Sequence, residues 1–321
     1  MRQPRSRPAV LLVVLATIAA ARLIAGGQTG SSGSQPPIRD NKRFESGIEV
    51  TSIAATVTDK EGHPLIDLTQ QNFEVYEDGV KQTITQFTHE RVPIGLGVLL
   101  DISDSMFGKR IQDARAAVDR FLFDLLDPDD EFFLAAFNHR PRVLTGWTRD
   151  RSEVERELAA LKPTGGTAIY DAIIAAVPLI ERRSRPRAAI LVISDGADTA
   201  STATLRELHT VMVRSDAFVY AIAIDSPEPQ PINTRVNVQT LREITGESGG
   251  RTEVVHNAVE LNEATARIAD ELNSQYMLGY TSPHGADGQF HSIRVRVPGT
   301  DDRVRSRNGY VAVPVARRSG Q

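Results

Sequence analysis

The middle of this 321-residue chain alternates short apolar runs with segments of helical spacing, and this alternation constrains its fold more than any other feature. Residues 94–100 (IGLGVLL) and 188–193 (AAILVI) are apolar runs of the length expected for strands buried on both faces. Apolar residues recur every three or four positions in 111–125, 168–180 and 258–272, which indicates amphipathic helices. Because strands that alternate with helices form parallel sheets covered on both sides, we expect a doubly wound α/β domain.

Other segments supply the remaining elements of this domain. They are strands at 131–137 and 218–224, a helix from a Thr204–Glu207 capping box through Val213, and a short helix at 238–245 that Gly246 closes.

Both ends of the body have a different pattern, in which apolar and polar residues alternate with the period of two typical of strands. In residues 44–90 two alternating runs meet at Asp78-Gly79, a dipeptide that favours a tight hairpin turn, and residues 275–315 alternate in the same way. Neither end has enough strands to fold alone. We therefore expect one small β-sandwich made of two halves, with the α/β domain, residues 91–274, inserted between them and a tail at 316–321.

The first 27 residues have the pattern of a secretory signal. Three arginines precede a 13-residue run of apolar residues and threonine at 9–21, and the small residues Ala25-Gly26-Gly27 follow Arg22. Thirteen helical residues extend about 20 Å, less than the roughly 30 Å of a hydrocarbon core. We expect a cleaved signal, with an uncleaved N-terminal anchor as the alternative. Residues 28–43 have the composition of a flexible linker, so the body is expected to be secreted, periplasmic or in the cell envelope.

Charge and cysteine content exclude several classes of protein. The chain has 37 Lys and Arg against 41 Asp and Glu, a net charge of −4, and four of the arginines lie in the first 27 residues. A body without a basic surplus is not expected to bind nucleic acid. The absence of cysteine excludes disulfides and thiolate metal sites. The seven histidines lack the short spacings of zinc sites, and we expect them on the surface or in the core.

Oxygen-bearing side chains follow both buried runs and one glycine-rich loop. The carboxyl ends of parallel strands meet at one edge of a sheet, so these side chains are expected to converge there. Two carboxylates and three hydroxyls, with no soft ligand, suit Mg²⁺ or Mn²⁺. The five candidate metal ligands are Asp101, Ser103, Ser105, Thr167 and Asp195.

The charges of these ligands predict how the site works. Two carboxylates cancel the charge of a dication and the hydroxyls add none, so the ion stays electrophilic. It keeps an open coordination position, held by water, that an Asp or Glu of another protein can fill. The sequence thus favours a metal-dependent protein-binding module over an enzyme. A Mg²⁺-dependent hydrolase is a weaker alternative, because a phosphatase of the haloacid dehalogenase type would need a second Asp where Ser103 stands. A metal-free structural scaffold is another alternative, and in that case Asp101, Ser103 and Ser105 form only a helix cap and turn.

These motifs resemble the metal-ion-dependent adhesion site of von Willebrand factor A and integrin I domains. Asp-x-Ser-x-Ser at 101–105, Gly-Gly-Thr-Ala at 165–168 and Ser-Asp-Gly at 194–196 occur in the order and context of that family, and the flanks resemble bacterial secreted VWFA-related domain proteins. The resemblance implies a Rossmann-like fold, Ser103, Ser105 and Thr167 as direct ligands, and Asp101 and Asp195 as direct or water-mediated ones. Asp104 departs from the family pattern, which often has glycine or a neutral residue there; its carboxylate either repels an acidic partner or faces solvent.

The other polar residues have structural interpretations. We expect Asp171 to be a helix N-terminal charge, with support of the metal ligands as the alternative, Asp198 an exposed loop charge and Glu271 part of a solvated helix face. The alternating aromatic residues of 276–280 are expected in the sandwich core.

Overall fold

The protein is described from a computed structural model, which covers residues 50–225, 237–299 and 302–312. The predicted signal, linker and tail lie outside the described residues. In the described part of the chain, no helix combines the length and the apolar character needed to cross a bilayer.

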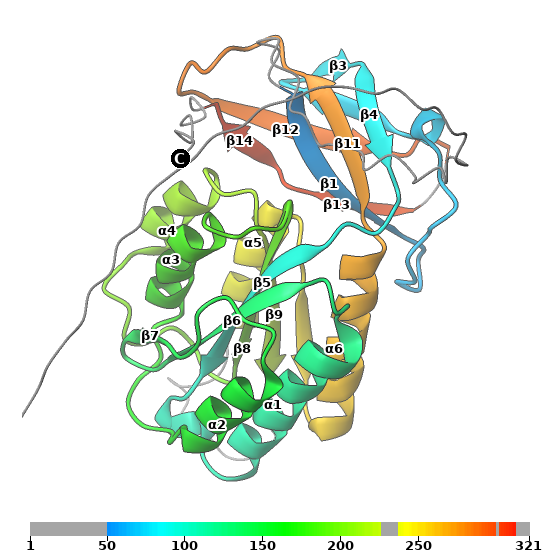
Figure 1. Cartoon of the computed structure of the whole chain (residues 1–321). Helices are drawn as coiled ribbons and strands as arrows, with labels where there is room; N and C mark the ends of the chain where they lie inside the picture. The colour runs from blue at the N-terminus through cyan, green and yellow to red at the C-terminus, as the bar shows by residue number, and fades with distance from the viewer. Residues whose placement is uncertain (1–49, 226–236, 300–301, 313–321) are drawn as a thin grey trace, which may run out of the picture. The chain divides into compact units, whose positions relative to one another are not determined.

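A six-stranded sheet forms the centre of the inserted domain (Figure 1). The strand order is β10-β9-β8-β5-β6-β7, and neighbours are parallel except for β7, which pairs antiparallel to β6 at one edge. Every residue of β5, β8 and β9 is buried, because helices cover both faces of the sheet. The strands are β5 (Ile94–Asp101), β6 (Glu131–Phe137), β7 (Pro141–Val143), β8 (Arg187–Ser194), β9 (Phe218–Ile224) and β10 (Thr252–Val255).

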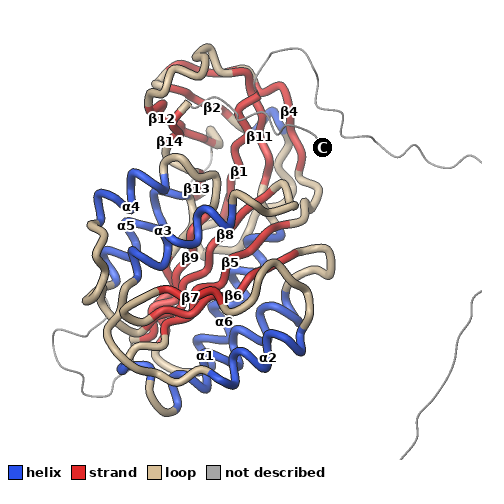
Figure 2. Tube along the Cα trace, turned by 60° about the vertical axis from the view of Figure 1, so that its left-hand side comes forward, coloured by secondary structure: helices blue, strands red, loops and turns tan. Residues whose placement is uncertain are grey.

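Two groups of helices cover the faces of this sheet (Figure 2). Alternate residues of β5 point into separate cores: Val98 and Leu100 pack with α1, α2 and α6, whereas Leu99 packs with α3, α4 and α5. This division confirms the predicted doubly wound α/β arrangement. The helices are α1 (Lys109–Arg120), which continues into a π-helical turn (Phe121–Leu125), α2 (Arg151–Ala160), α3 (Ile169–Ile180), α4 (Leu205–Met212), α5 (Val238–Ser248) and α6 (Ala258–Asn273).

Strands from the two ends of the body pair with each other, as predicted. β1 pairs with β11 and β2 with β12, both antiparallel, within two four-stranded sheets of order β13-β1-β11-β4 and β14-β12-β2-β3. A shared core that includes Ile53, Val75, Tyr276 and Tyr280 lies between the sheets, so the aromatic residues of 276–280 are core residues. The strands are β1 (Val50–Thr58), β2 (Glu74–Glu77), β3 (Val80–Gln82), β4 (Ile84–Thr88), β11 (Tyr276–Thr281), β12 (Phe290–Arg296), β13 (Arg303–Ser306) and β14 (Gly309–Val311).

The α/β domain is therefore inserted between two halves of a β-sandwich. The exact domain limits stay a prediction. They are 44–90 and 275–315 for the two halves of the sandwich and 91–274 for the inserted domain.

Some local predictions are confirmed and others are wrong. Asp78 and Gly79, with φ of 48° and 79°, form the predicted turn between β2 and β3. The predicted end of α5 is wrong: the helix runs through Gly246 and ends at Ser248, because Gly249 (φ 88°) is the residue in the left-handed conformation. The sequence did not indicate α2, β7, β10 or β13, which are short or bury few apolar side chains.

Glu271 on α6 also differs from the expectation of a solvated face. Its side chain is buried and pairs with Arg305 of β13 at 2.5 Å and with Arg251 at 3.1 Å, and it accepts a hydrogen bond from Tyr220 Oη at 2.9 Å. These contacts join α6 to the sandwich strand β13.

The connections to the sandwich leave the opposite edge of the central sheet open for the candidate site. β4 leads into the amino end of β5 through residues 89–93, and α6 ends beside the same connection, where Arg91 Nε donates to Asn273 Oδ1 at 3.0 Å. β5 and β8 both run from the end of the sheet near the sandwich toward the opposite end. The loops that carry the predicted metal ligands therefore lie at the far, carboxyl edge of the sheet (Figure 1).

Candidate metal centre

Asp101 lies at the point where β5 ends, with its side chain fully buried. Its Oδ1 accepts a hydrogen bond from Ser103 N at 2.7 Å, and its Oδ2 accepts one from Ser194 Oγ at 2.5 Å. Ser194 is the last residue of β8, which pairs with β5 in parallel. Parallel pairing thus places the ends of both buried strands side by side.

Ser103 and Ser105 face Asp195 from the loop after β5. Ser103 Oγ lies 3.0 Å from Ser105 Oγ, and Ser105 Oγ donates to Asp195 Oδ1 at 2.6 Å. A short 3₁₀ turn (Asp104–Met106) follows Ser103, whose side chain makes no capping bond to it, and α1 starts after Gly108, likewise without a side-chain cap. The serine hydroxyls are therefore directed at the carboxylates and are not used as helix caps.

Thr167 packs against the residue that follows Asp195. A Cβ placed on Gly196 would lie 3.1 Å from Thr167 Oγ1, so the glycine lets this buried hydroxyl approach the Asp195 loop. The loop before Thr167 is joined to the loop after β5 by a hydrogen bond from Asp104 N to Gly165 O at 2.9 Å. The structure thus connects four of the five predicted residues through hydrogen bonds and places Thr167 against Gly196, the neighbour of Asp195.

Two further aspartates hold these loops, and a supporting role was expected only as an alternative for Asp171 and not for Asp198. Asp198 Oδ2 accepts hydrogen bonds from Tyr170 N at 3.0 Å and Ser201 Oγ at 2.6 Å. Asp171 accepts hydrogen bonds from the backbone of Thr202 at 2.9 Å and of the residue after it. Both carboxylates fasten the loop after β8 to the first turn of α3. The polar run 198–204 (DTASTAT) was the available signal, because such side chains favour caps and turns.

Burial dominates the electrostatics of the two candidate ligand carboxylates. It raises the pKa of Asp101 to about 7, although hydrogen bonds from Ser194 and Ser103 favour the ionised form. Burial also raises the pKa of Asp195, against the opposing effects of Ser105 and the Arg110 guanidinium. The folded protein therefore confines two acids where negative charge is poorly solvated.

One buried oxygen in this cluster has no hydrogen bond. Within the part of the chain that the structure describes, Asp195 Oδ2 is buried without a hydrogen-bond partner, and Arg110 Nη1 lies 3.5 Å from it. Buried carboxylate oxygens are normally hydrogen bonded or paired with a cation. A buried carboxylate oxygen that has a distant guanidinium but no hydrogen bond, and that lies among hydroxyl and carboxylate oxygens, has the chemistry of a site for a hard dication, so the residues present fit Mg²⁺ or Mn²⁺.

Comparison with known proteins agrees with this arrangement of strands and loops. The family profile for the von Willebrand factor type A domain matches residues 96–197, a range that contains all five candidate ligands. This match confirms the predicted resemblance to von Willebrand factor A domains over that range. The chain's fold class is thereby the one that the sequence motifs implied.

The curated relatives of this chain are mostly much longer. Human inter-alpha-trypsin inhibitor heavy chain H4 is 24% identical over 224 residues, which are 61% of this chain and 23% of that protein. The pig heavy chain H4 is 34% identical over 97 residues, 29% of this chain and 10% of that protein. The chain thus spans less than a quarter of the length of these relatives.

Solved structures that are similar to parts of this chain have low sequence identity to it. A von Willebrand factor type A protein from Catenulispora acidiphila is 12% identical, with a TM-score of 0.49 over 85% of this chain and 76% of that one. The BatB protein from Bacteroides thetaiotaomicron is 22% identical, with a TM-score of 0.48 over 56% of this chain and 98% of that one.

Proposed function

We propose that this protein is an extracytoplasmic protein-binding module whose contact with its partner depends on a metal ion. One Mg²⁺, or Mn²⁺, is held by Asp101, Ser103, Ser105, Thr167 and Asp195. When bound, the ion supplies an electrophilic position that accepts an Asp or Glu carboxylate of the partner protein.

The buried Oδ2 of Asp195, which accepts no hydrogen bond, is the observation that carries this proposal. Von Willebrand factor type A domains typically mediate protein–protein interaction or adhesion, and we propose that general role for this chain. Arg110 Nη1, at 3.5 Å, offers this oxygen an ion pair but no hydrogen bond, so a metal ion among the ligand oxygens would compensate the buried charge more closely.

The charge of the site favours an acidic partner. Two carboxylates balance a dication and three hydroxyls add no charge, so a bound ion retains affinity for a further anionic ligand. The Arg110 guanidinium beside Asp195 adds positive charge at the same place.

The rim of the site suggests what else the partner presents. Phe107, two residues after Ser105, is a 78% exposed aromatic side chain, and Asp104 is exposed beside it. We propose that an apolar group of the partner packs on Phe107 while its carboxylate reaches the metal. Asp104, the residue that departs from the family pattern, would disfavour a second acid next to the first.

The extracytoplasmic location rests on the N-terminal sequence pattern. Its basic start, apolar run and small-residue exit lie outside the described residues, so export is part of the proposal.

A capture experiment tests the proposal. The protein is immobilised and incubated with culture medium or envelope extract in Mg²⁺, in EDTA, and in EDTA followed by excess Mg²⁺. We expect one set of partners that binds in Mg²⁺, is released by EDTA and returns with Mg²⁺. Thr167→Ala should lose these partners, because it removes a ligand hydroxyl. Thr164→Ala, the same change at an exposed position of the same loop, should keep them.

The alternatives predict different results. A metal-free scaffold predicts that the same partners bind in EDTA and that they bind Thr167→Ala. Either result would contradict metal-dependent partner binding. A Mg²⁺-dependent hydrolase predicts turnover of a generic phosphoester or ester that Thr167→Ala abolishes. We propose no catalysis, because Asp195, the carboxylate that accepts a hydrogen bond from Ser105 Oγ, is assigned here to the metal, and so is Ser103, the other described neighbour of that hydroxyl.

A further inference from the structure

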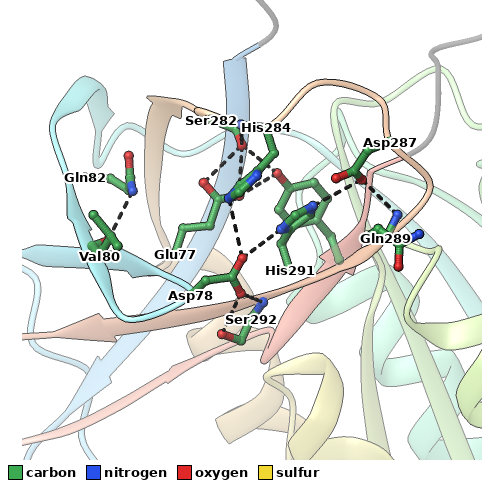
Figure 3. Close-up of polar contacts among 11 residues, drawn as sticks. Glu77, Asp78, Val80, Gln82, Ser282, His284, Asp287, Gln289, His291 and Ser292 are labelled. Carbon is green, nitrogen blue, oxygen red and sulfur yellow. Dashed lines mark hydrogen bonds and ion pairs between the residues drawn. The ribbon is translucent and has the colours of Figure 1, made fainter.

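A second cluster of potential ligands lies in the β-sandwich, where the turn between β2 and β3 meets the loop before β12 (Figure 3). Asp78 Oδ2 is 2.8 Å from His291 Nδ1 and 3.5 Å from His284 Nε2. One donor atom of each of the three residues lies within 4.8 Å of the other two. The sequence did not indicate this site, because Asp78 and His291 are 213 positions apart and meet only through the pairing of β2 with β12.

The Asp78 carboxylate is held in the orientation of a metal ligand. Its Oδ1 accepts hydrogen bonds from Ser292 N at 2.8 Å and Ser292 Oγ at 3.1 Å. Oδ2 is left to face both imidazoles (Figure 3). Carboxylates that bind metals are commonly fixed in this way through the oxygen that does not bind.

The His291 ring is held from its other side by a second carboxylate. Its Nε2 lies 3.2 Å from Asp287 Oδ1, and its side chain is only 6% exposed. A histidine that binds a metal normally donates its second ring N–H to a carboxylate or carbonyl, which fixes the tautomer. If Nε2 donates to Asp287, the Nδ1 lone pair of neutral His291 points at Asp78 Oδ2. Two acceptors then face each other, and a cation between them removes the conflict.

We propose that Asp78, His284 and His291 bind a borderline transition-metal dication of the Zn²⁺ class, with Asp287 as the residue that positions His291. Zn–N and Zn–O bonds of about 2.0–2.2 Å place neighbouring ligand atoms roughly 3.3 Å apart, close to the spacings of 2.8 and 3.5 Å from Asp78 Oδ2. The two imidazole rings are stacked with centroids 4.0 Å apart, so the exposed His284 ring would have to turn toward the ion. Asp78 and His284 are 40% and 38% exposed, which leaves the fourth position to water. Two imidazoles distinguish this site from the oxygen-only site at the edge of the central sheet.

Such a site would tie together the two halves of the sandwich. Asp78 belongs to the segment before the inserted domain, and both histidines belong to the segment after it. An ion bound only by the folded arrangement stabilises the fold in proportion to its concentration and affinity. We therefore infer a structural role for this metal, independent of the proposed partner binding.

A second mixed cluster in the described residues provides an internal control. His209 Nδ1 lies 3.4 Å from Glu247 and His209 Nε2 lies 3.9 Å from Glu243, so the two carboxylates face opposite nitrogens of one ring. That geometry is an ion-pair triad with a single imidazole, and it offers a dication fewer nitrogen ligands. His209→Ala therefore controls for adventitious binding at surface histidines.

The test uses the untagged full-length protein, stripped of metal and returned to excess Mg²⁺. Zn²⁺ binding is measured by calorimetric titration, and Co²⁺ is used as a spectroscopic probe of ligand geometry. We expect one equivalent of Zn²⁺, a Co²⁺ spectrum of a four- or five-coordinate nitrogen and oxygen site, and a rise in the thermal midpoint of about 3 °C or more. His284→Ala and Asp78→Asn should abolish all three, since asparagine keeps the Oδ1 acceptor and tolerates the left-handed φ of residue 78. His209→Ala should leave them unchanged.

Asp287→Asn separates the positioning role from ligation. It should weaken Zn²⁺ binding by about 10- to 100-fold without changing the stoichiometry. The proposal is overturned if no Zn²⁺ binds at 100-fold excess, which would leave His291 as an imidazolium between two carboxylates. It is also overturned if His209→Ala, and not His284→Ala, removes the bound ion.

Discussion

Asp101 shows how the site works against the stability of the metal-free fold. Burial raises its pKa to about 7, whereas an unfolded chain has an aspartate pKa of about 3.9. Between these values the unfolded chain has released the proton and the folded protein has retained it. The contribution of Asp101 to the free energy of unfolding of the metal-free protein therefore falls as pH rises from about 4 to 7. A cation beside the carboxylate offsets this cost, so the site is built for a ligand and against maximal stability.

Replacing this carboxylate with its neutral isostere tests that statement. Asp101→Asn keeps an oxygen that accepts from Ser103 N but removes the buried charge. In EDTA at pH 8 we expect the free energy of unfolding of the variant to exceed that of wild type by roughly 1–4 kcal/mol. The difference should vanish near pH 4. Added Mg²⁺ should stabilise wild type and not the variant.

Urea unfolding at the two pH values measures both effects. Asp104→Asn, the same change at the exposed neighbour, should match wild type throughout. Equal stabilisation of wild type and Asp101→Asn by Mg²⁺ would contradict the assigned ligand set.

At the scale of elements, the end of α5 distinguishes two glycines that look alike in sequence. Gly246 has open space where a Cβ would be, whereas at Gly249 (φ 88°) a Cβ would meet the backbone of Ser306 at 2.6 Å. We expect Gly246→Ala to raise the free energy of unfolding by about 0.5–1 kcal/mol, because alanine favours a helix interior. Gly249→Ala should lower it by about 2 kcal/mol or more. Chemical denaturation of the matched pair checks both signs; a stabilising Gly249→Ala would place the helix end elsewhere.

The same contrast explains how much of the fold the sequence predicts. The runs that became β5 and β8 are buried on both faces, so their composition alone indicates strands, and the ligand loops follow from their ends. α2 buries only Val154 and Leu158, which gives weak periodicity. Gly246 and Gly249 differ only in backbone conformation, which the letters do not record.

The candidate sites differ in the same way. Asp101, Ser103 and Ser105 are close in sequence and follow a recognisable strand, so the sequence alone predicts that they act together. Asp198, which fastens a loop to α3, and the histidines 284 and 291 acquire their partners only through tertiary contacts. Glu271 is an acid on an amphipathic helix, and nothing local to α6 indicates that Arg305 covers it.

At the scale of the whole molecule, that buried ion pair couples the inserted domain to the sandwich. Arg305 of β13 is largely buried and pairs with Glu271 of α6 at 2.5 Å. Glu271→Gln should lower the free energy of unfolding by about 3–5 kcal/mol, because it leaves a buried guanidinium uncompensated. Glu263→Gln, an exposed position of the same helix, should change it little.

Thermal unfolding followed by calorimetry measures the loss. It also shows whether the von Willebrand factor type A domain and the sandwich melt together. An unchanged midpoint in Glu271→Gln would mean that this pair does not couple the two parts.

The most direct measurement is a titration of the metal-stripped protein with Mn²⁺, in which electron paramagnetic resonance counts the free ion and Mg²⁺ competes for the site. We predict one bound Mn²⁺ that Mg²⁺ displaces, present in Thr164→Ala and His284→Ala and lost in Thr167→Ala and Asp101→Asn. A bound ion that survives both of the latter substitutions, or no Mg²⁺-displaceable ion in the wild-type protein, would contradict the account.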